Sequence, residues 1–218
     1  MLIIFDFDGV IADSEYLANL VLAECVSELG VPTTLEESYQ QYMGKRFEDV
    51  LTAVETTIGK PLPDTFPAEY QQRTLDQFRV DLKPVSGALE FLREFHDLPV
   101  CIASSSSPDR LRLCIEVLGI GNRFADNVYS ASMVERGKPF PDIFLHAASE
   151  MGHLPKDCVV IEDSPSGVEA GIAAGMTVIG LTAASHIQPD HAEKLRASGA
   201  HYIASNYGKA ADLMRIIT

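Results

Sequence analysis

The stretch that decides the fold is LIIFDFDGV, which occupies residues 2–10. Its four leading apolar residues predict a short buried strand, and Asp6, Asp8 and Gly9 follow where that strand should end. Residues two apart leave a strand on the same side, so we expect both carboxylates to face one site. Gly9 would let the backbone turn sharply beneath them. On turn chemistry alone, an Asp cap and a Gly turn at the start of a helix are an alternative.

A second acidic strand end lies far downstream. The apolar residues 159–161 lead into Glu162 and Asp163. Sites in open α/β sheets gather beyond the carboxyl ends of the strands, so the two acidic ends are expected at one edge of a sheet. Carboxylates brought together there form an oxygen-ligand metal site, most naturally for Mg²⁺.

Length and charge restrict the class of protein. A chain of 218 residues suits one large domain or a domain with a modest insert. Its 17 Lys and Arg against 31 Asp and Glu give a formal net charge of −14, which argues against nucleic acid and acidic membrane surfaces as partners. A phosphorylated substrate would therefore need a local cation. The sequence gives no indication of oligomeric state.

Cysteine usage indicates a compartment. Four cysteines lie in or beside apolar segments without metal-ligand spacing, which predicts buried free thiols in a reducing environment. They are Cys25, Cys101, Cys114 and Cys158. No signal peptide or membrane span is predicted, so we expect a cytoplasmic protein.

The chain alternates strands and helices from about residue 85 onward. Apolar runs predict strands at 100–104, 127–130, 158–162, 177–181 and 202–204. Helical patterns fall at 87–97, 108–118, 141–151, 164–174 and 209–216. This alternation indicates an α/β fold with a doubly wound, mainly parallel, Rossmann-like sheet.

Residues 14–84 break that rhythm. Helices are predicted at 14–29, 46–58 and 67–78. The capping box from Thr34 to Glu37 predicts a further helix start, and no strand is predicted between these helices. We therefore expect an α/β catalytic core made of residues 1–13 and 85–218, with an inserted α-helical cap at 14–84.

Two further segments carry polar groups suited to phosphate. Ser104 and Ser105 follow a predicted strand and precede a helix N-terminus, an arrangement that binds phosphate, although a solvated turn with a serine cap is the alternative. Lys138 lies in a loop stiffened by Pro139 and Pro141. An exposed loop lysine is the ordinary interpretation of such a residue.

Taken in order, these four motifs resemble those of the haloacid dehalogenase superfamily of phosphotransfer enzymes, and the resemblance spans the whole chain. The helical insert looks like the cap of the β-phosphoglucomutase and sugar-phosphatase branch. Gly44, Lys45 and Arg46 are similar to a Gly-x-x-Arg-type cap segment of that branch, with the arginine one place early. Lys45 and Arg46 are thus candidates for binding the distal groups of the substrate.

The resemblance implies roles for the motif residues. Asp6 would be the nucleophile that forms an aspartyl-phosphate, and Asp8 the general acid and then the base. Ser104 and Lys138 would bind the phosphoryl oxygens. Mg²⁺ would be held by Asp6, the backbone carbonyl of Asp8, and Asp163, with Glu162 in support. The activity implied is that of a Mg²⁺-dependent phosphatase acting on a small phosphorylated metabolite, a sugar or sugar-acid phosphate.

Two alternatives remain at this point. The mutases and many sugar phosphatases of the branch carry a histidine five places after the residue that corresponds to Asp13, where this chain has Ala18. This departure favours hydrolysis over a hexose-phosphate mutase, which must protect its phosphoenzyme from water. A receiver-like signalling module also combines a phospho-accepting Asp with a Lys-Pro, but here the second acidic pair follows the lysine.

Overall fold

The computed structural model describes residues 1–43 and 47–217 and divides the chain into two compact units. One unit comprises Met1–Asp13 and Lys83–Thr218, and the other Ser14–Leu82. Within the described residues, no helix has the length and apolar character needed to cross a membrane.

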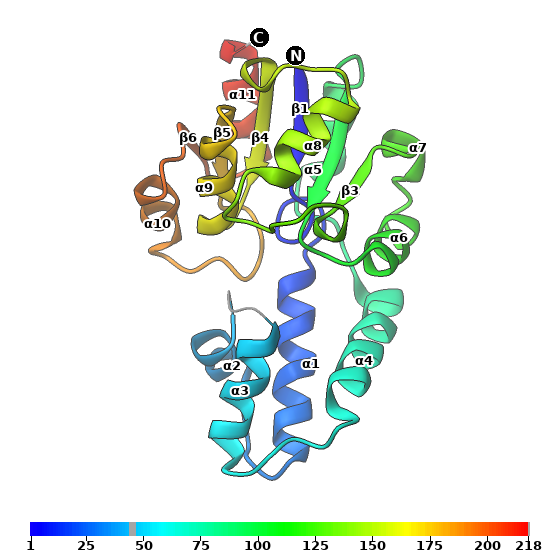
Figure 1. The fold of residues 1–218 in the computed structure, drawn as a ribbon, viewed down its shortest axis with the longest axis vertical. Helices are drawn as coiled ribbons and strands as arrows, with labels where there is room; N and C mark the ends of the chain where they lie inside the picture. The colour runs from blue at the N-terminus through cyan, green and yellow to red at the C-terminus, as the bar shows by residue number, and fades with distance from the viewer. Residues whose placement is uncertain (44–46, 218) are drawn as a thin grey trace. The chain divides into compact units, whose positions relative to one another are not determined.

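The larger unit is built on a six-stranded sheet in the order β3-β2-β1-β4-β5-β6, with every neighbouring pair parallel (Figure 1). The strands are β1 (Leu2–Phe5), β2 (Val100–Ser104), β3 (Val128–Ser130), β4 (Cys158–Glu162), β5 (Thr177–Leu181) and β6 (Tyr202–Ala204). The prediction of a doubly wound, mainly parallel sheet is confirmed. The strand order reverses between β1 and β4, which is where such sheets form their sites.

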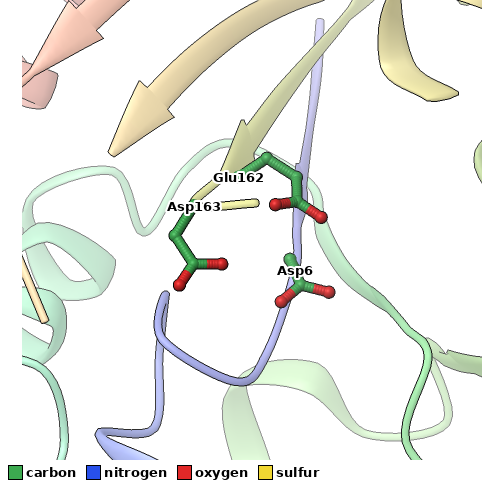
Figure 2. Close-up of side chains that lie close together, drawn as sticks. All are labelled: Asp6, Glu162 and Asp163. Atoms are coloured by element: carbon green, nitrogen blue, oxygen red, sulfur yellow. The ribbon is translucent and has the colours of Figure 1, made fainter. Parts of the chain in front are cut away.

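The pairing register brings the two acidic strand ends side by side. Phe5 pairs with Ile161, and the backbone N–H of Asp6 donates to the carbonyl of Ile161 at 2.9 Å. Asp6 thus extends the ladder by one residue and lies beside Glu162, the last residue of β4. Figure 2 shows both side chains, with Asp163, at this edge of the sheet.

Helices cover both faces of the sheet. They are α5 (Ala88–Glu94), α6 (Pro108–Val117), α7 (Gly121–Phe124), α8 (Asp142–Glu150), α9 (Pro165–Ala173), α10 (His191–Ala197) and α11 (Tyr207–Ile217). Short 3₁₀ turns occur at Ala131–Met133 and Pro155–Asp157. Helix α10 was not predicted from the sequence, because the segment between β5 and β6 shows no clear helical period of apolar residues.

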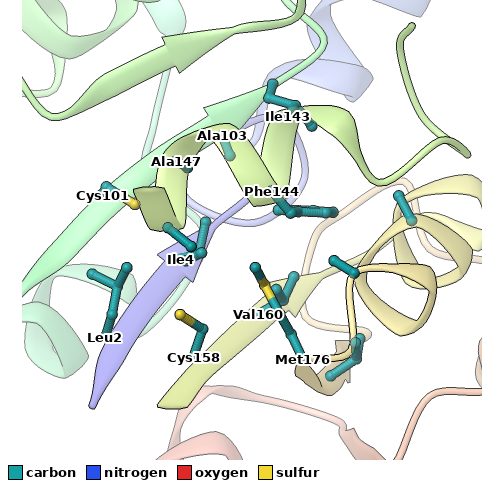
Figure 3. Packing of buried hydrophobic residues seen from close by; sticks show 14 of the residues in the cluster. Leu2, Ile4, Cys101, Ala103, Ile143, Phe144, Ala147, Cys158, Val160 and Met176 are labelled. Carbon is teal, nitrogen blue, oxygen red and sulfur yellow. The ribbon is translucent and has the colours of Figure 1, made fainter. Parts of the chain in front are cut away.

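Alternation along the strands divides the core into two layers. Leu2 and Ile4 pack in a cluster with Phe144 of α8 on one face (Figure 3), whereas Phe5 points to the other. There the Phe5 ring meets those of Phe91 and Phe124 edge-on, at centroid distances of 5.9 and 6.1 Å. Full burial of each large apolar side chain contributes about 1.5–3 kcal/mol. Strands buried on both faces explain the continuous apolar runs in the sequence.

Among its described residues, the smaller unit contains four helices and no strand. They are α1 (Ser14–Glu28), α2 (Leu35–Gln41), α3 (Phe47–Ile58) and α4 (Phe66–Asp81). The predicted capping box is present, because the Glu37 N–H donates to the Thr34 hydroxyl while the Thr34 N–H donates to the Glu37 carboxylate. Val26 and Val54 lie fully buried in its own apolar core.

All four cysteines are free and buried, as expected. Cys25 lies in the smaller unit and the other three in the larger one. Burial raises the pKa of the Cys114 thiol to about 12 and that of Cys158 to about 11, so both stay protonated at neutral pH.

Candidate active site

Three carboxylates converge where β1 and β4 end. One oxygen each from Asp6, Glu162 and Asp163 lie within 4.8 Å of one another (Figure 2). The three residues are only 7%, 1% and 5% exposed. Burying like charges this close is unfavourable unless cations balance them.

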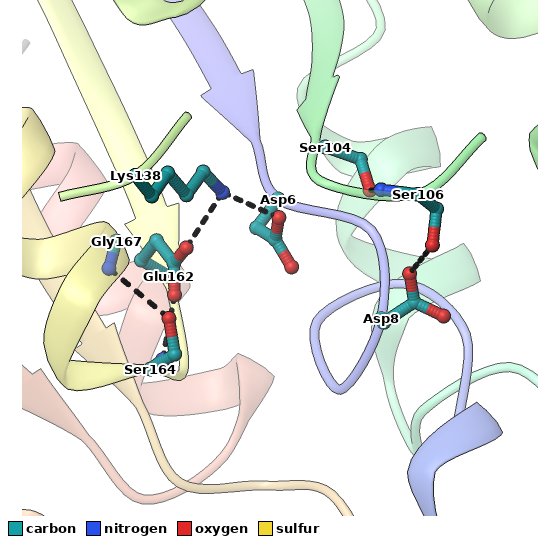
Figure 4. Close-up of polar contacts among 8 residues, drawn as sticks. All are labelled: Asp6, Asp8, Ser104, Ser106, Lys138, Glu162, Ser164 and Gly167. Atoms are coloured by element: carbon teal, nitrogen blue, oxygen red, sulfur yellow. Dashed lines mark hydrogen bonds and ion pairs between the residues drawn. The ribbon is translucent and has the colours of Figure 1, made fainter. Parts of the chain in front are cut away.

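One of those cations belongs to the chain itself. The Nζ atom of Lys138 donates to Oδ1 of Asp6 at 2.6 Å and to Oε1 of Glu162 at 2.7 Å (Figure 4). Its side chain is only 4% exposed and its ammonium lies 4.9 Å from the centroid of the Phe144 ring. The ordinary interpretation of Lys138 as an exposed loop residue is therefore wrong.

One ammonium against three carboxylates leaves the cluster with an excess of negative charge. Burial raises the pKa of Asp6 well above its usual value; Lys138 opposes this rise, while Glu162 and Asp163 add to it. For Lys138, burial alone would lower the pKa, but the two carboxylates it contacts outweigh burial and raise it. A buried set of three hard oxygen donors fits a divalent cation such as Mg²⁺.

Glu162 is held rigidly by its surroundings. Its Oε2 accepts a hydrogen bond from the backbone N–H of Ser164 at 2.6 Å, while Oε1 accepts from Lys138. A Cβ atom on Gly167 would lie 1.6 Å from Oε1, so only glycine leaves room for this carboxylate. Because both oxygens accept protein donors, Glu162 orients Lys138 beside Asp6.

Asp8 belongs to a second and different group. The hydroxyl of Ser106 donates to its Oδ2 at 2.6 Å, and a guanidinium nitrogen of Arg110 donates to Oδ1 at 2.5 Å. Figure 4 shows the Asp8 carboxylate directed toward Ser106 and that of Asp6 toward Lys138. The Asp8 side chain is 14% exposed and that of Arg110 is 24% exposed.

Local sequence explains how β2 supplies this second group. Ser107 is the N-cap of α6 and its hydroxyl accepts from the backbone N–H of Arg110, which fixes the first turn of the helix. Within the preceding turn, the Ser106 N–H donates to the buried hydroxyl of Ser104 at 3.0 Å. A hydroxyl that accepts in this way can still donate its own O–H to a phosphate oxygen.

The structure places the predicted residues in two groups. Asp6, Lys138, Glu162 and Asp163 form the buried carboxylate cluster, while Asp8 and Ser104 lie with the serine turn after β2. Ser105 is exposed. Lys45 and Arg46 lie outside the described residues, so their predicted contact with substrate stays a prediction.

Three polar partners of the Asp8 and Asp163 carboxylates were missed in the sequence. Ser106 and Arg110 contact Asp8, and His186 contacts Asp163 at 3.3 Å. A usable signal existed, because each lies shortly after a predicted parallel strand, on the edge where sites form. Their residue types alone fit surface positions equally well.

Comparison with known proteins identifies the family. Residues 1–175 match the family model of the haloacid dehalogenase-like hydrolases. The chain is 27% identical over 188 residues to the 6-phosphogluconate phosphatase of Escherichia coli (strain K12), covering 86% of this chain and 85% of that protein. It is 32% identical over 217 residues to a probable pseudouridine-5'-phosphatase of Drosophila melanogaster, covering 95% of this chain and 94% of that one.

A solved structure shows the same likeness in three dimensions. A haloacid dehalogenase family hydrolase from Deinococcus radiodurans R1, with bound phosphate and sodium, superposes with a TM-score of 0.84 at 33% identity. The match covers 98% of this chain and 95% of that one. The chain therefore belongs to the haloacid dehalogenase-like hydrolases.

Proposed function

We propose that this protein is a Mg²⁺-dependent phosphatase that hydrolyses a small phosphorylated metabolite through an aspartyl-phosphate on Asp6. The observation that carries the proposal is the buried cluster of three carboxylates around Lys138 at the switch point of the sheet. The family is a hydrolase family, and the two relatives compared above are named as phosphatases. A phosphoric monoester hydrolase is the activity that both lines support.

Asp6 and Asp163 would hold the Mg²⁺ ion, with the backbone carbonyl of Asp8 and support from Glu162. When bound, the ion supplies positive charge that screens the repulsion between a carboxylate and an anionic phosphate. The excess negative charge of the cluster is the feature of this chain that favours a divalent cation.

In the first step, the Asp6 carboxylate attacks phosphorus while the bond to the leaving oxygen breaks. Lys138 keeps Asp6 oriented and offsets the negative charge that gathers around the phosphoryl group. The hydroxyl of Ser104 binds a phosphoryl oxygen. Asp8, in its protonated form, gives a proton to the leaving alkoxide, so that a neutral alcohol departs.

In the second step, water attacks the phosphorus of the aspartyl-phosphate. The Asp8 carboxylate takes a proton from that water, the bond between phosphorus and the Asp6 oxygen breaks, and inorganic phosphate leaves. Ser106 and Arg110 both donate to the Asp8 carboxylate and hold it in place for this step. Asp6 is regenerated as a carboxylate.

A sugar phosphate or sugar-acid phosphate is the substrate class we propose. The relative from E. coli is a 6-phosphogluconate phosphatase, and the one from D. melanogaster is named for a phosphorylated nucleoside. Lys45 and Arg46 would bind the distal groups of an anionic sugar. Phosphate release should be measured with 6-phosphogluconate, glucose 6-phosphate and pseudouridine 5'-phosphate, and no release above background from any of the three would contradict the proposed substrate class.

Mass spectrometry of protein quenched during turnover tests the intermediate. We expect a phosphoryl group on Asp6 in the wild type, none in Asp6→Asn, and an unchanged signal in Asp109→Asn. Asp109 is a suitable control because its side chain is 86% exposed. A phosphoryl group found on another residue would overturn the assignment.

Ala18 supplies no imidazole, so we expect hydrolysis rather than transfer within a hexose phosphate. With β-glucose 1-phosphate, inorganic phosphate should be the product and glucose 6-phosphate should not accumulate. A coupled glucose-6-phosphate dehydrogenase assay measures this directly. NADPH formation faster than phosphate release would favour a mutase instead.

A further inference from the structure

Two histidines that the proposed mechanism does not use contact Asp163. Nε2 of His186 lies 3.3 Å from Oδ2 of the Asp163 carboxylate, and Nε2 of His191 lies 2.5 Å from its backbone carbonyl oxygen. His186 lies in the segment between β5 and α10, and His191 is the first residue of α10. Asp163 is thus held at its side chain and at its main chain by one segment.

The His186 ring is enclosed. It is only 5% exposed, and its centroid lies 6.4 Å from that of His191 in an edge-on arrangement. Gly9, with a φ of 76°, approaches so closely that a Cβ atom there would lie 1.8 Å from Oδ2 of Asp163 and 2.9 Å from Cε1 of His186. The turn after β1 therefore packs directly against the Asp163 carboxylate and the His186 ring.

This arrangement determines which way Asp163 faces. A carbonyl oxygen can only accept, so His191 presents Nε2–H toward the Asp163 main chain, and the 3.3 Å contact of His186 Nε2 with Oδ2 fits the same direction for the carboxylate. A partner at one carboxylate oxygen fixes the orientation of the whole group. Without the donor, the Asp163 carboxylate could rotate away from two neighbouring carboxylates that repel it.

We propose that His186 is a positioning residue that orients the Asp163 carboxylate for the metal ion. The proposal rests on the metal site put forward above. Partners of this kind typically change metal affinity by about ten- to a hundredfold when they are removed. His186 thereby sets the Mg²⁺ affinity of the protein through Asp163.

Isothermal titration of Mg²⁺ into the metal-free full chain, without substrate, measures this affinity directly. Three variants separate the hydrogen bond from the volume of the ring. His186→Gln keeps an N–H donor at about the same reach, His186→Met has a similar length and no donor, and His186→Ala removes both. We expect about ten- to a hundredfold weaker binding in the Met and Ala variants, and most of the wild-type affinity in the Gln variant.

A matched histidine controls for unspecific effects. His153 lies in the same unit, and its side chain contacts the carbonyl of Met151 rather than the site. His153→Met should bind Mg²⁺ as the wild type does. Circular dichroism confirms the fold of each variant, and the Gln and Met pair decides the question even where the Ala variant fails to fold.

Enzyme assays give a second readout. In His186→Met, the Mg²⁺ concentration for half-maximal activity should rise by the same factor as the dissociation constant, while kcat at saturating Mg²⁺ stays within a few-fold of wild type. A purely structural role would not be rescued by Gln. Unchanged Mg²⁺ affinity in His186→Met, or equal losses in the Gln and Met variants, would overturn the proposal.

The two proposals fail in different ways. If the wild-type protein binds no Mg²⁺, or if Asp163→Ala binds it as tightly as wild type, the proposed metal site is wrong and His186 has nothing to position. If the wild type binds Mg²⁺ through Asp163 and His186→Met does so equally well, only the inference about His186 is wrong.

Discussion

Asp6 and Asp8 are two residues apart on one turn, yet their surroundings are opposite. Asp6 lies in a buried cluster of three carboxylates, two of which, those of Asp6 and Glu162, contact the Lys138 ammonium. Asp8 has a guanidinium partner, a hydroxyl donor and some access to solvent. The first environment leaves negative charge in excess, and the second balances it within the chain.

This difference matches the two tasks that phosphoryl transfer requires. A group that binds a metal ion and attacks phosphorus benefits from a site rich in negative charge, because a metal ion bound there would supply the missing positive charge. A group that gives and takes protons benefits from a balanced, partly accessible site. The surroundings rather than the residue type separate nucleophile from acid and base.

Replacing the nucleophile should have the largest effect. We expect Asp6→Asn to lower kcat by at least on the order of 10⁴-fold, because an amide neither attacks phosphorus nor binds the metal well. Burial raises the pKa of Asp6, so the carboxylate contributes no stability to the metal-free protein at neutral pH. The Tm of metal-free Asp6→Asn should therefore equal or exceed that of wild type. More than about a tenth of wild-type kcat would contradict the covalent mechanism.

Removing the lysine should mainly destabilise the fold. In Lys138→Met, the buried carboxylates of Asp6 and Glu162 lose their ammonium partner, which typically costs about 3–5 kcal/mol of unfolding free energy. Urea unfolding of the metal-free protein measures this loss. Lys156→Met replaces an exposed lysine and should change stability by no more than about 0.5 kcal/mol. Equal losses in both variants would mean that Lys138 does not balance the cluster.

Metal binding should stabilise the buried cluster specifically. Mg²⁺ at about 100 times its dissociation constant should raise the free energy of unfolding by about 2.7 kcal/mol, and chelation should abolish activity. Asp163→Ala should show neither the stabilisation by Mg²⁺ nor Mg²⁺-dependent activity. Asp190→Ala, at a position 59% exposed, should show both as the wild type does. Full activity in excess chelator would refute the metal requirement.

The smallest effect is expected for Arg110, the charged partner of Asp8. Arg110→Gln weakens a charge-assisted hydrogen bond worth about 1.5–3 kcal/mol, so hydrolysis of the phosphoenzyme should slow by about tenfold or more. Its formation should slow less, so quenched samples should contain more phosphorylated Asp6. Arg112→Gln on the same helix is the control, since Arg112 pairs with Asp109 and is 75% exposed. A decrease in phosphoenzyme would show that Arg110 does not support the base.

The sequence by itself determined the sheet and the acidic strand ends. Continuous apolar runs such as residues 2–5 and 158–161 can be buried on both faces only in a parallel sheet, so β1 and β4 were predicted at their observed bounds. The parallel direction then places Asp6 and Glu162 at one edge, whatever the helices do. Helix α10 was not predictable in this way, because its seven residues carry too weak a period.

Only the tertiary structure decided which donor each carboxylate meets. Ser106 and Arg110 are 98 and 102 residues from Asp8 along the chain, and Lys138 is 132 residues from Asp6. Local patterns reveal that a residue is polar, but its partner depends on strand order and register, which are set by packing across the whole sheet. The contrast between Asp6, in a cluster with excess negative charge, and Asp8, whose charge is balanced by Arg110, is therefore a property of the folded unit.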